Sequence, residues 1–264
     1  MPKKPPAHAA ETVTTYHYNA SSVAATGYLI LPVQEVMPVQ ASVAVPMGGG
    51  HGRTTVENFS HHGIFSFRYA HSEAIGRSSV KKKEWSTLAQ TVIEGLNIHQ
   101  MVTVDRIVSR IAIHHSMDGK DSGITPLGST IQGLRVGGYL IEPDLAVDWF
   151  AEHDTYESFE KHHRDPKVRG QFAKMSFVKG KGEEMPHSKG IVGCTMVRDW
   201  GKLPGGIVPH GRGLWIPEFG MLYIAELYMD QGSRRVRMIR TELGCGSCGC
   251  YGGGSSSGGG SPWP

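Results

Sequence analysis

The stretch TVIEGLNIHQMVTV (91–104) decides how the fold is interpreted, because two related stretches occur elsewhere in the chain. They are TVENFSHHGIFSF (55–67) and STIQGLRVGGYLIE (129–142). Val56, Ile93 and Ile131 hold the same position in the three copies, 37 and 38 residues apart. Periods of roughly 20–50 residues are typical of supersecondary units that stack to bury an apolar face. The sequence therefore predicts three related segments, over 54–69, 91–106 and 129–144.

Each copy has the same internal order of residue types. An acid or amide is followed by a small turn residue and then by a large apolar residue, as in Glu94-Gly95-Leu96. Asn58 and Gly133 hold the position of Gly95 in the other two copies. An apolar run resumes five residues later, which predicts a strand interrupted by a local turn or bend.

The second copy carries the clearest strand pattern. Residues 102–104 and 111–113 alternate between strongly apolar and smaller or polar side chains, as half-buried strands do. The alternation slips between them, at Asp105 and Arg106, which predicts a bulge or a bend. This pair could mark a functional site, because bulges change the direction of side chains. Alternatively, it could be a surface ion pair that contributes little to stability.

Two further regions predict strands. The Val-rich region 27–45 is interrupted by prolines, which favours short strands at a sheet edge. Residues 221–229 and 234–243 are predicted to form a hairpin that turns through 230–232. Strict alternation places Arg235 and Arg237 on one face of its second strand. It places Arg234 and Arg240 on the other face.

The remaining segments complete the predicted organisation. Helical spacings predict a short helical insert over 149–176. The last residues, GCGSCGCYGGGSSSGGGSPWP (244–264), lack the apolar side chains of a core, and Gly/Ser runs behave as flexible coil. The expected fold is therefore mainly β, a β-sandwich or a short β-repeat stack. One domain would cover 13–243, between a flexible N-terminus (1–12) and a disordered tail (244–264), and three copies favour the closed sandwich over an open solenoid.

Composition excludes some classes of protein. The 264 residues include 27 basic and 24 acidic side chains, so the bulk charge does not favour nucleic-acid binding. No apolar run approaches the ~18 residues of a membrane-spanning helix. The start MPKKPPAHAA is basic but is followed by Glu11 and polar residues, so no secretory signal is expected. The default localisation is cytoplasmic, with surface association as an alternative.

The C-terminal cysteines form one candidate metal site. Cys245, Cys248 and Cys250 have the spacing C-x2-C-x-C, and three thiolates can surround one zinc or copper ion. A tetrahedral site would need a fourth ligand, such as Cys194 or a histidine. The alternative is a tail with reducible or cross-linking thiols, so no cofactor is required by the sequence.

The histidines form a second candidate. Three histidine pairs are adjacent in sequence, and neighbours in a strand point to opposite faces, so we do not expect a β pair to close on one ion alone. His62 and His99 hold the same repeat position. On neighbouring strands they would lie about 5 Å apart and could share an ion.

Catalytic motifs are missing from the sequence. It contains neither G-x-S-x-G nor H-E-x-x-H. Cys194 lies in an apolar run, where a buried and inert thiol is expected. No catalytic residue is therefore assigned, and the protein is predicted not to be an enzyme. A carbohydrate-binding domain is favoured by three aromatic residues that we expect to be exposed, Trp85, Trp200 and Trp215.

The segment 85–145 resembles the β repeats of bacterial choice-of-anchor P-type proteins. The resemblance is carried by TVIEGLNI, VTVDRIVSR and GSTIQGLRVGGY. It implies a β-repeat scaffold and use at a cell surface, although the export signal and sorting tail of that family are not evident here. The whole chain, including IPEFGMLYIAEL (216–227), is also similar to bacterial proteins described only as hypothetical.

Taken together, these patterns predict a non-catalytic structural or interaction module that binds a protein partner or itself. The alternative is a metal-binding protein or metal-dependent enzyme that uses the cysteines or histidines. A carbohydrate-binding β domain is the third hypothesis.

Overall fold

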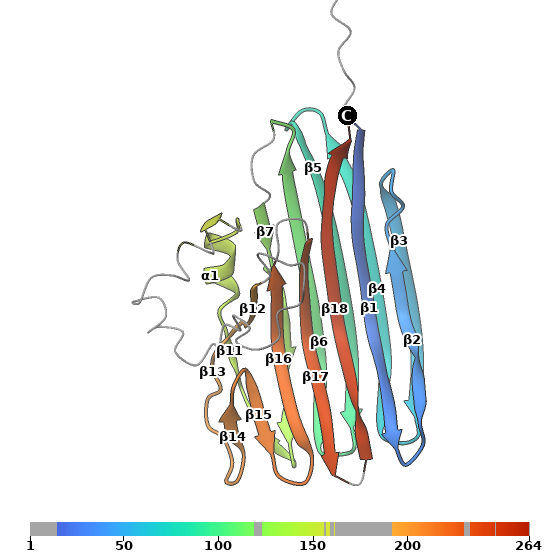
Figure 1. The fold of residues 1–264 in the computed structure, drawn as a ribbon, viewed down its shortest axis with the longest axis vertical. Coiled ribbons are helices and arrows are strands. Elements are labelled where there is room, and N and C mark those ends of the chain that lie inside the picture. Colours follow the sequence, from blue (N-terminus) through green and yellow to red (C-terminus); the bar gives the residue numbers. More distant parts are fainter. Residues whose placement is uncertain are drawn as a thin grey trace, which may run out of the picture.

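The computed structural model describes residues 15–118, 123–155, 157–158, 161, 192–229, 233–245 and 247–263. Two antiparallel eight-stranded sheets, A and B, lie one in front of the other (Figure 1). Their facing side chains form one large apolar cluster that draws residues from both sheets. The prediction of a mainly β fold is confirmed, and the arrangement is the closed sandwich.

Sheet A has the strand order β14-β15-β16-β17-β18-β1-β2, and β12 pairs with β16. Its strands are β1 (Thr15–Leu31), β2 (Glu35–Ala44), β12 (Val192–Thr195), β14 (Val208–His210), β15 (Gly213–Ile216), β16 (Gly220–Met229), β17 (Ser233–Cys245) and β18 (Ser247–Trp263). The predicted hairpin 221–243 is present as β16 and β17. The prediction of edge strands in 27–45 is correct for β2 and wrong for β1, which lies inside the sheet.

Sheet B has the strand order β10-β9-β6-β5-β4-β3, and β7 and β8 pair with β6. Its strands are β3 (Gly50–His61), β4 (Phe65–Ser79), β5 (Glu84–Ile98), β6 (Val102–Ser116), β7 (Gly123–Thr125), β8 (Thr130–Gln132), β9 (Arg135–Val136) and β10 (Tyr139–Leu140). Each of the three related segments begins on one strand and continues onto the next. Segment 54–69 runs from β3 into β4, 91–106 runs from β5 into β6, and 129–144 includes β8, β9 and β10.

A small third sheet and one helix lie beside the sandwich. The sheet pairs β11 (Asp144–Leu145) with β13 (Val197–Asp199), and the helix is α1 (Val147–Glu152), whose Phe150 is buried. The predicted helical insert thus begins two residues earlier than expected, and 162–176 lie outside the described residues, as does the N-terminal segment 1–12. No helix in the described part of the chain is long and apolar enough to span a membrane.

A row of left-handed residues crosses sheet B. Asn58, Gly95 and Gly133 have φ values of 51°, 65° and 65°. The register places them level with one another, with Arg68 and Asp105 between them on β4 and β6. On each long strand, every second residue is more deeply buried than its neighbours, and the alternation shifts by one residue at this row. The slip predicted at Asp105 and Arg106 is confirmed, and both residues form ion pairs at the surface, Asp105 with Arg135 and Arg106 with Glu94.

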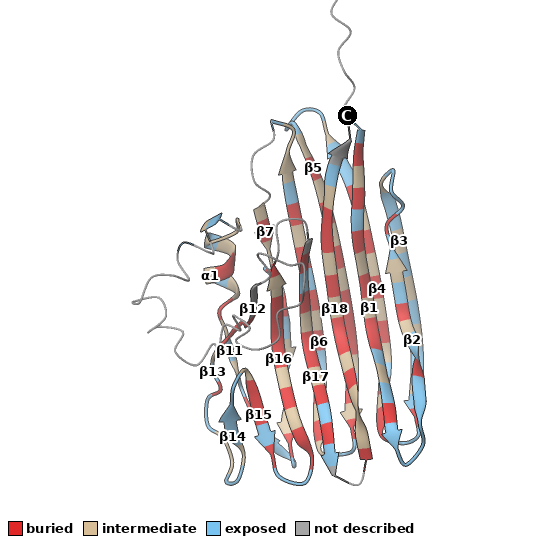
Figure 2. Ribbon diagram, in the orientation of Figure 1, coloured by how far each residue is buried: buried red, intermediate tan, exposed pale blue. Residues whose placement is uncertain are grey.

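Sheet A has a corresponding row. Ala41, Gly254 and Ala225 have φ values of 43°, 61° and 50°, and Ala24 and Met238 lie between them on β1 and β17. The alternation of buried residues along the strands again shifts by one residue at this row. Buried residues therefore continue along the long strands on both sides of these rows (Figure 2).

The prediction of a disordered tail is wrong, because the C-terminal segment forms the interior strand β18 between β17 and β1. Its small residues are complementary to large residues on sheet B. A Cβ atom placed on Gly258 would lie 2.8 Å from Ile113 Cδ1, and one on Gly254 would lie 3.1 Å from Ile107 Cγ2. Tyr251, a large aromatic residue of this strand, is fully buried and stacks on Phe65 of β4. The neighbouring strands thus supply the core that the segment lacks.

Replacing Gly254 by valine tests this packing. The β-branched side chain would have to adopt a left-handed φ and fit against Ile107 and Met238. Strain and overpacking together predict a loss of about 2–5 kcal/mol in the free energy of unfolding, measured by urea denaturation. Ser255→Val, which points to the outer face, is the matched control and should change stability by less than about 0.5 kcal/mol. Equal losses for the two variants would contradict this packing.

Candidate functional site

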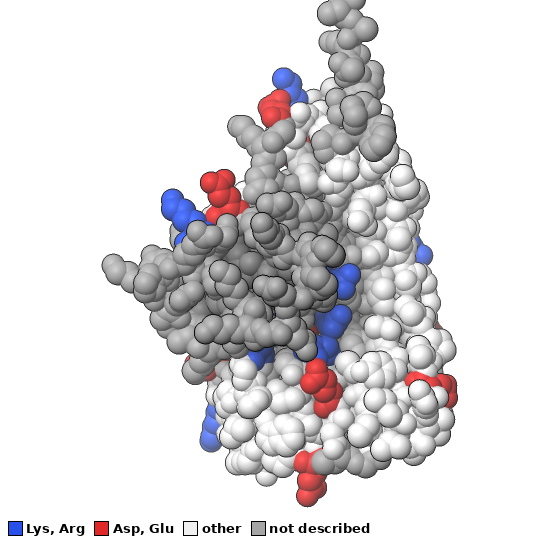
Figure 3. All heavy atoms as spheres, viewed as in Figure 1, with Lys and Arg blue, Asp and Glu red and all other residues white. Residues whose placement is uncertain are grey.

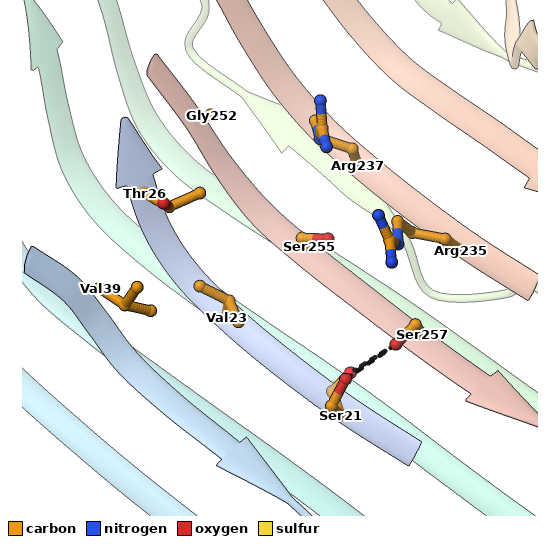
Figure 4. Close-up of a pocket in the computed structure, with 9 residues that line it drawn as sticks. All are labelled: Ser21, Val23, Thr26, Val39, Arg235, Arg237, Gly252, Ser255 and Ser257. Carbon is orange, nitrogen blue, oxygen red and sulfur yellow. Dashed lines mark hydrogen bonds between the residues drawn. The ribbon is translucent and has the colours of Figure 1, made fainter. Parts of the chain in front are cut away.

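A shallow groove crosses the outer face of sheet A. It encloses about 220 Å³ and runs over β2, β1, β18 and β17 (Figure 4). The residues that line it are Ser21, Val23, Thr26, Val39, Arg235, Arg237, Gly252, Ser255 and Ser257. Ser21 and Ser257 are joined across the strands by a 2.8 Å hydrogen bond between their hydroxyls.

The groove exists because β18 has small side chains on both of its faces. Gly252, Ser255 and Ser257 form a low floor, while longer side chains rise on either side. Figure 4 shows Arg235 and Arg237 on β17 along one side of this floor and Val39 on β2 along the other. The two sides of the groove therefore differ in chemistry, one being cationic and the other apolar.

A network around Glu226 lies next to the groove. Glu226 is fully buried and accepts two 2.9 Å hydrogen bonds from Arg240, from Nε and Nη2. Tyr228 Oη donates a third hydrogen bond, 3.1 Å long, and Arg212 lies 3.8 Å away. Burial alone would raise the pKa of Glu226, but the hydrogen bonds and charge of Arg240 outweigh it and hold the pKa below its usual range.

Arg240 forms ion pairs within this network, whereas Arg237 of the groove acts on it only through its charge, which helps to lower the pKa of Glu226. Arg240 also pairs with Glu242 and lies over the Tyr223 ring, 3.7 Å from its centroid. Within the described residues, no carboxylate forms an ion pair with Arg235 or Arg237. Figure 3 shows basic side chains over β17, beside a surface over β18, β1 and β2 that is largely uncharged.

The predicted facing of the arginines is partly wrong. Arg235 and Arg237 share the outer face as expected, and Arg234 is buried. Arg240, however, lies on the outer side with Arg235 and Arg237. Met238 belongs to the row at which the strands change their buried face, so the alternation counted from Arg235 does not continue to Arg240.

The histidine ladder expected from the repeats is not formed. His62 and His99 follow β3 and β5, which are separated by β4 rather than adjacent. His99 Nε2 lies 3.4 Å from Ser247 Oγ, whereas His62 Nε2 lies 2.8 Å from Glu35 Oε2. The structure instead brings His62 together with His61 and Glu35, whose ligand atoms all lie within 4.8 Å of one another. The hydrogen bond with His62 is the main cause that lowers the pKa of Glu35.

The cysteines are placed along sheet A. Cys248 and Cys250 lie on β18, opposite Gly244 and Glu242 of β17, and both are half-buried. Burial raises the pKa of the Cys250 thiol. Cys194 on β12 is fully buried, as expected of an inert thiol, and burial strongly raises its pKa. The side chain of Cys245 is outside the described part, so the three-cysteine site stays a prediction.

The tryptophans do not form a shared exposed surface. Trp85 and Trp200 are buried, at 7% and 4% exposure, and only Trp215 of the three is exposed. Trp85 stacks on Tyr16, with ring centroids 4.7 Å apart, which places it in the packing of the sandwich. The expectation that all three are exposed is wrong, because bulky aromatic residues supply much of the core area.

Sequence reasoning missed the groove and the role of Glu35. The groove depends on the outer face of β18, a segment predicted to have no fixed structure. Glu35 meets the histidines only because the edge strands β2 and β3 of opposite sheets lie together, and no sequence spacing reports that contact. The adjacent pair His61-His62 was the available signal.

Glu226→Gln tests the buried network. Removing the charge leaves Arg240 with the exposed Glu242 alone, so we expect the free energy of unfolding at pH 7 to fall by roughly 3 kcal/mol. Because the folded-state pKa of Glu226 is depressed, its contribution is full above the ordinary value, about 4.3, and is lost as the pH falls through the folded pKa. Urea titrations at falling pH should therefore show a smaller acid-induced loss in the variant.

The matched control for this prediction is Glu242→Gln. Glu242 is 49% exposed, so its pair with Arg240 should contribute no more than about 1 kcal/mol. Equal effects of the two substitutions would contradict the assignment of Glu226 as the buried centre.

Comparisons with known proteins give one match. No curated protein and no solved structure matches the chain. A family described as a domain of unknown function (DUF8256) matches residues 16–230, which run from β1 through β16. This match covers most of the 264 residues. The chain therefore belongs to the DUF8256 family.

Proposed function

We propose that the protein is a non-catalytic interaction module that binds an extended acidic and apolar segment of a protein partner in the groove of sheet A. The observation that carries this proposal is the contrast between the two sides of the groove. Arg235 and Arg237 line one side, and Val23 and Val39 lie toward the other.

The cationic side supports an acidic ligand. Glu226 and Glu242 are both engaged by Arg240, which leaves the guanidinium groups of Arg235 and Arg237 available to carboxylates. Arginine forms paired hydrogen bonds with carboxylates and stays charged at any physiological pH. A carboxylate of the ligand would give Arg235 and Arg237 the ion pairs that the described residues do not supply.

The apolar side supports a protein partner over a small acid. It continues along the hairpin of β1 and β2, where Tyr28, Ile30, Val36 and Val39 are each about half exposed or more. Tyr28 and Val36 are register partners on the same face. Contiguous exposed apolar residues at a rim of polar ones are typical of protein-binding surfaces.

The size of the groove favours an extended segment. Pockets that enclose small molecules usually measure roughly 300–1,000 Å³, and this groove measures about 220 Å³ and is open along the sheet. Such a groove accommodates a few side chains of a longer ligand. In an extended chain, side chains alternate in direction, so one set would meet the floor while flanking residues reach the arginines and valines.

The chemistry of the groove supports binding rather than catalysis. The residues that line it include arginines and hydroxyls but no carboxylate or imidazole that would act as a general base. The hydroxyls of Ser21 and Ser257 are joined by a hydrogen bond. Because each hydroxyl can make further hydrogen bonds, the pair can also bond to a ligand.

An array of extended octapeptides tests the proposal. The wild-type protein should bind peptides in which Asp or Glu alternates with aliphatic residues, and binding should weaken as salt rises. The double variant Arg235→Ala/Arg237→Ala should lose this binding by about tenfold or more, since hydrogen bonds to charged groups contribute ~1.5–3 kcal/mol each. Fluorescence polarisation with the selected peptides provides the affinities.

The controls separate a specific groove from general charge attraction. Arg53→Ala/Arg77→Ala removes the same number of charges from sheet B and should leave binding unchanged. Peptides with Lys in place of the acids should not bind. The proposal is wrong if no acidic and apolar peptide binds, or if both double variants bind equally well.

A further inference from the structure

Glu35, His61 and His62 form a compact cluster where the edge strands β2 and β3 meet. Glu35 Oε2 lies 2.8 Å from His62 Nε2, and Glu35 Oε1 lies 3.4 Å from His61 Nε2. The two imidazole rings are 4.5 Å apart between centroids and nearly perpendicular. Within the described residues, this is the one group of three histidine, cysteine or acidic side chains whose ligand atoms converge in this way.

Backbone conformation explains why adjacent histidines converge. His62 has a φ of 52°, in the left-handed region, at the first residue after β3. This turn interrupts the alternation of a strand, so His61 and His62 do not point to opposite faces. The expectation that adjacent histidines on a strand point to opposite faces is therefore wrong for this pair.

His61 is a buried side chain with one nitrogen left over. It is 6% exposed, and Nδ1 lies 2.9 Å from the hydroxyl of Tyr251 on β18. Its Nε2 is buried and has no hydrogen-bond partner among the described residues, and 3.4 Å to Glu35 is too long for a good hydrogen bond. Leaving such a buried atom unsatisfied costs about 1–3 kcal/mol. This nitrogen points into the cluster.

We propose that Glu35, His61 and His62 bind one divalent transition-metal cation of the zinc class, an inference that does not depend on the peptide groove. Two imidazoles and one carboxylate are a common ligand set for such ions, with water in the remaining position. Ligands about 2.1 Å from a tetrahedral ion lie about 3.4 Å from one another. The 3.4 Å distance from His61 to Glu35 Oε1 matches that value, and the 2.8 Å distance from His62 to Glu35 Oε2 is shorter, as a hydrogen bond is.

Tyr251 completes the arrangement as a second layer. With its proton on Nδ1, His61 donates to the Tyr251 hydroxyl and presents the Nε2 lone pair to the ion. Partners of this kind fix the orientation and tautomer of metal-binding histidines. Tyr251 also stacks on Phe65, so the core of the sandwich holds it in place.

The location gives the ion a structural consequence. Glu35 belongs to sheet A, and His61 and His62 belong to the end of an edge strand of sheet B. A bound cation would therefore join the edges of the two sheets. Because it would bind the folded state only, it should raise the melting temperature as its concentration rises.

Zinc titration of the full-length chain, freed of metal and kept reduced, tests the proposal. Isothermal titration calorimetry should show one zinc ion per chain, and zinc should raise the Tm. Glu35→Gln and His62→Gln change exposed side chains, and each should weaken zinc binding by about tenfold or more. Tyr251→Phe should weaken it by roughly 10–100-fold, the range seen for second-layer partners.

A matched control is provided by a similar pair without a third ligand. His51 Nε2 lies 2.7 Å from Glu73 Oε1 on β3 and β4, so His51→Gln should leave the affinity unchanged. Substitution with Co²⁺ identifies the ligands, because nitrogen and oxygen ligands give visible d–d bands without the charge-transfer band of a thiolate. The proposal is overturned by absent zinc binding, by unchanged binding in Glu35→Gln and His62→Gln, or by a thiolate band that disappears in Cys248→Ser/Cys250→Ser.

Discussion

The contact between the small side chains of β18 and the isoleucines of sheet B is the interaction on which the rest of the structure depends. β18 lies between β17 and β1, and its glycines at 253, 254 and 258 leave space that Ile93, Ile107 and Ile113 fill. Close-packed interiors tolerate little empty volume. A strand with larger residues would push the sheets apart, and a missing strand would separate β1 and β2 from the remainder of sheet A.

The same strand places both candidate sites. Its outward residues are also small, so they form the floor of the groove between the arginines of β17 and the apolar hairpin of β1 and β2. Its Tyr251 reaches through the core to His61 and orients that imidazole toward Glu35. One low-complexity segment therefore connects the packing of the sandwich, the proposed protein-binding groove and the proposed metal site.

Local sequence patterns predicted local structure well. The alternation of apolar residues identified the hairpin of β16 and β17 and the slip at Asp105, because both depend on neighbours in sequence. The three related segments marked equivalent places on alternate strands. Composition failed for β18, since it reports whether a segment can form its own core and not whether other strands provide one. His61 and His62 converge because His62 has a left-handed φ value. Arg240 lies on the outer face because the alternation along β17 shifts at Met238. Simple alternation encodes neither feature.

Hydrogen exchange of the backbone amides in 247–263 tests the central claim most directly. As an interior strand, β18 donates and accepts hydrogen bonds on both sides, to β17 and to β1. Its amides should therefore exchange as slowly as those of β5, near the limit set by global unfolding. Exchange of these amides at the rate of a free peptide, with β5 still protected, would show that the segment is a flexible tail and would contradict the account.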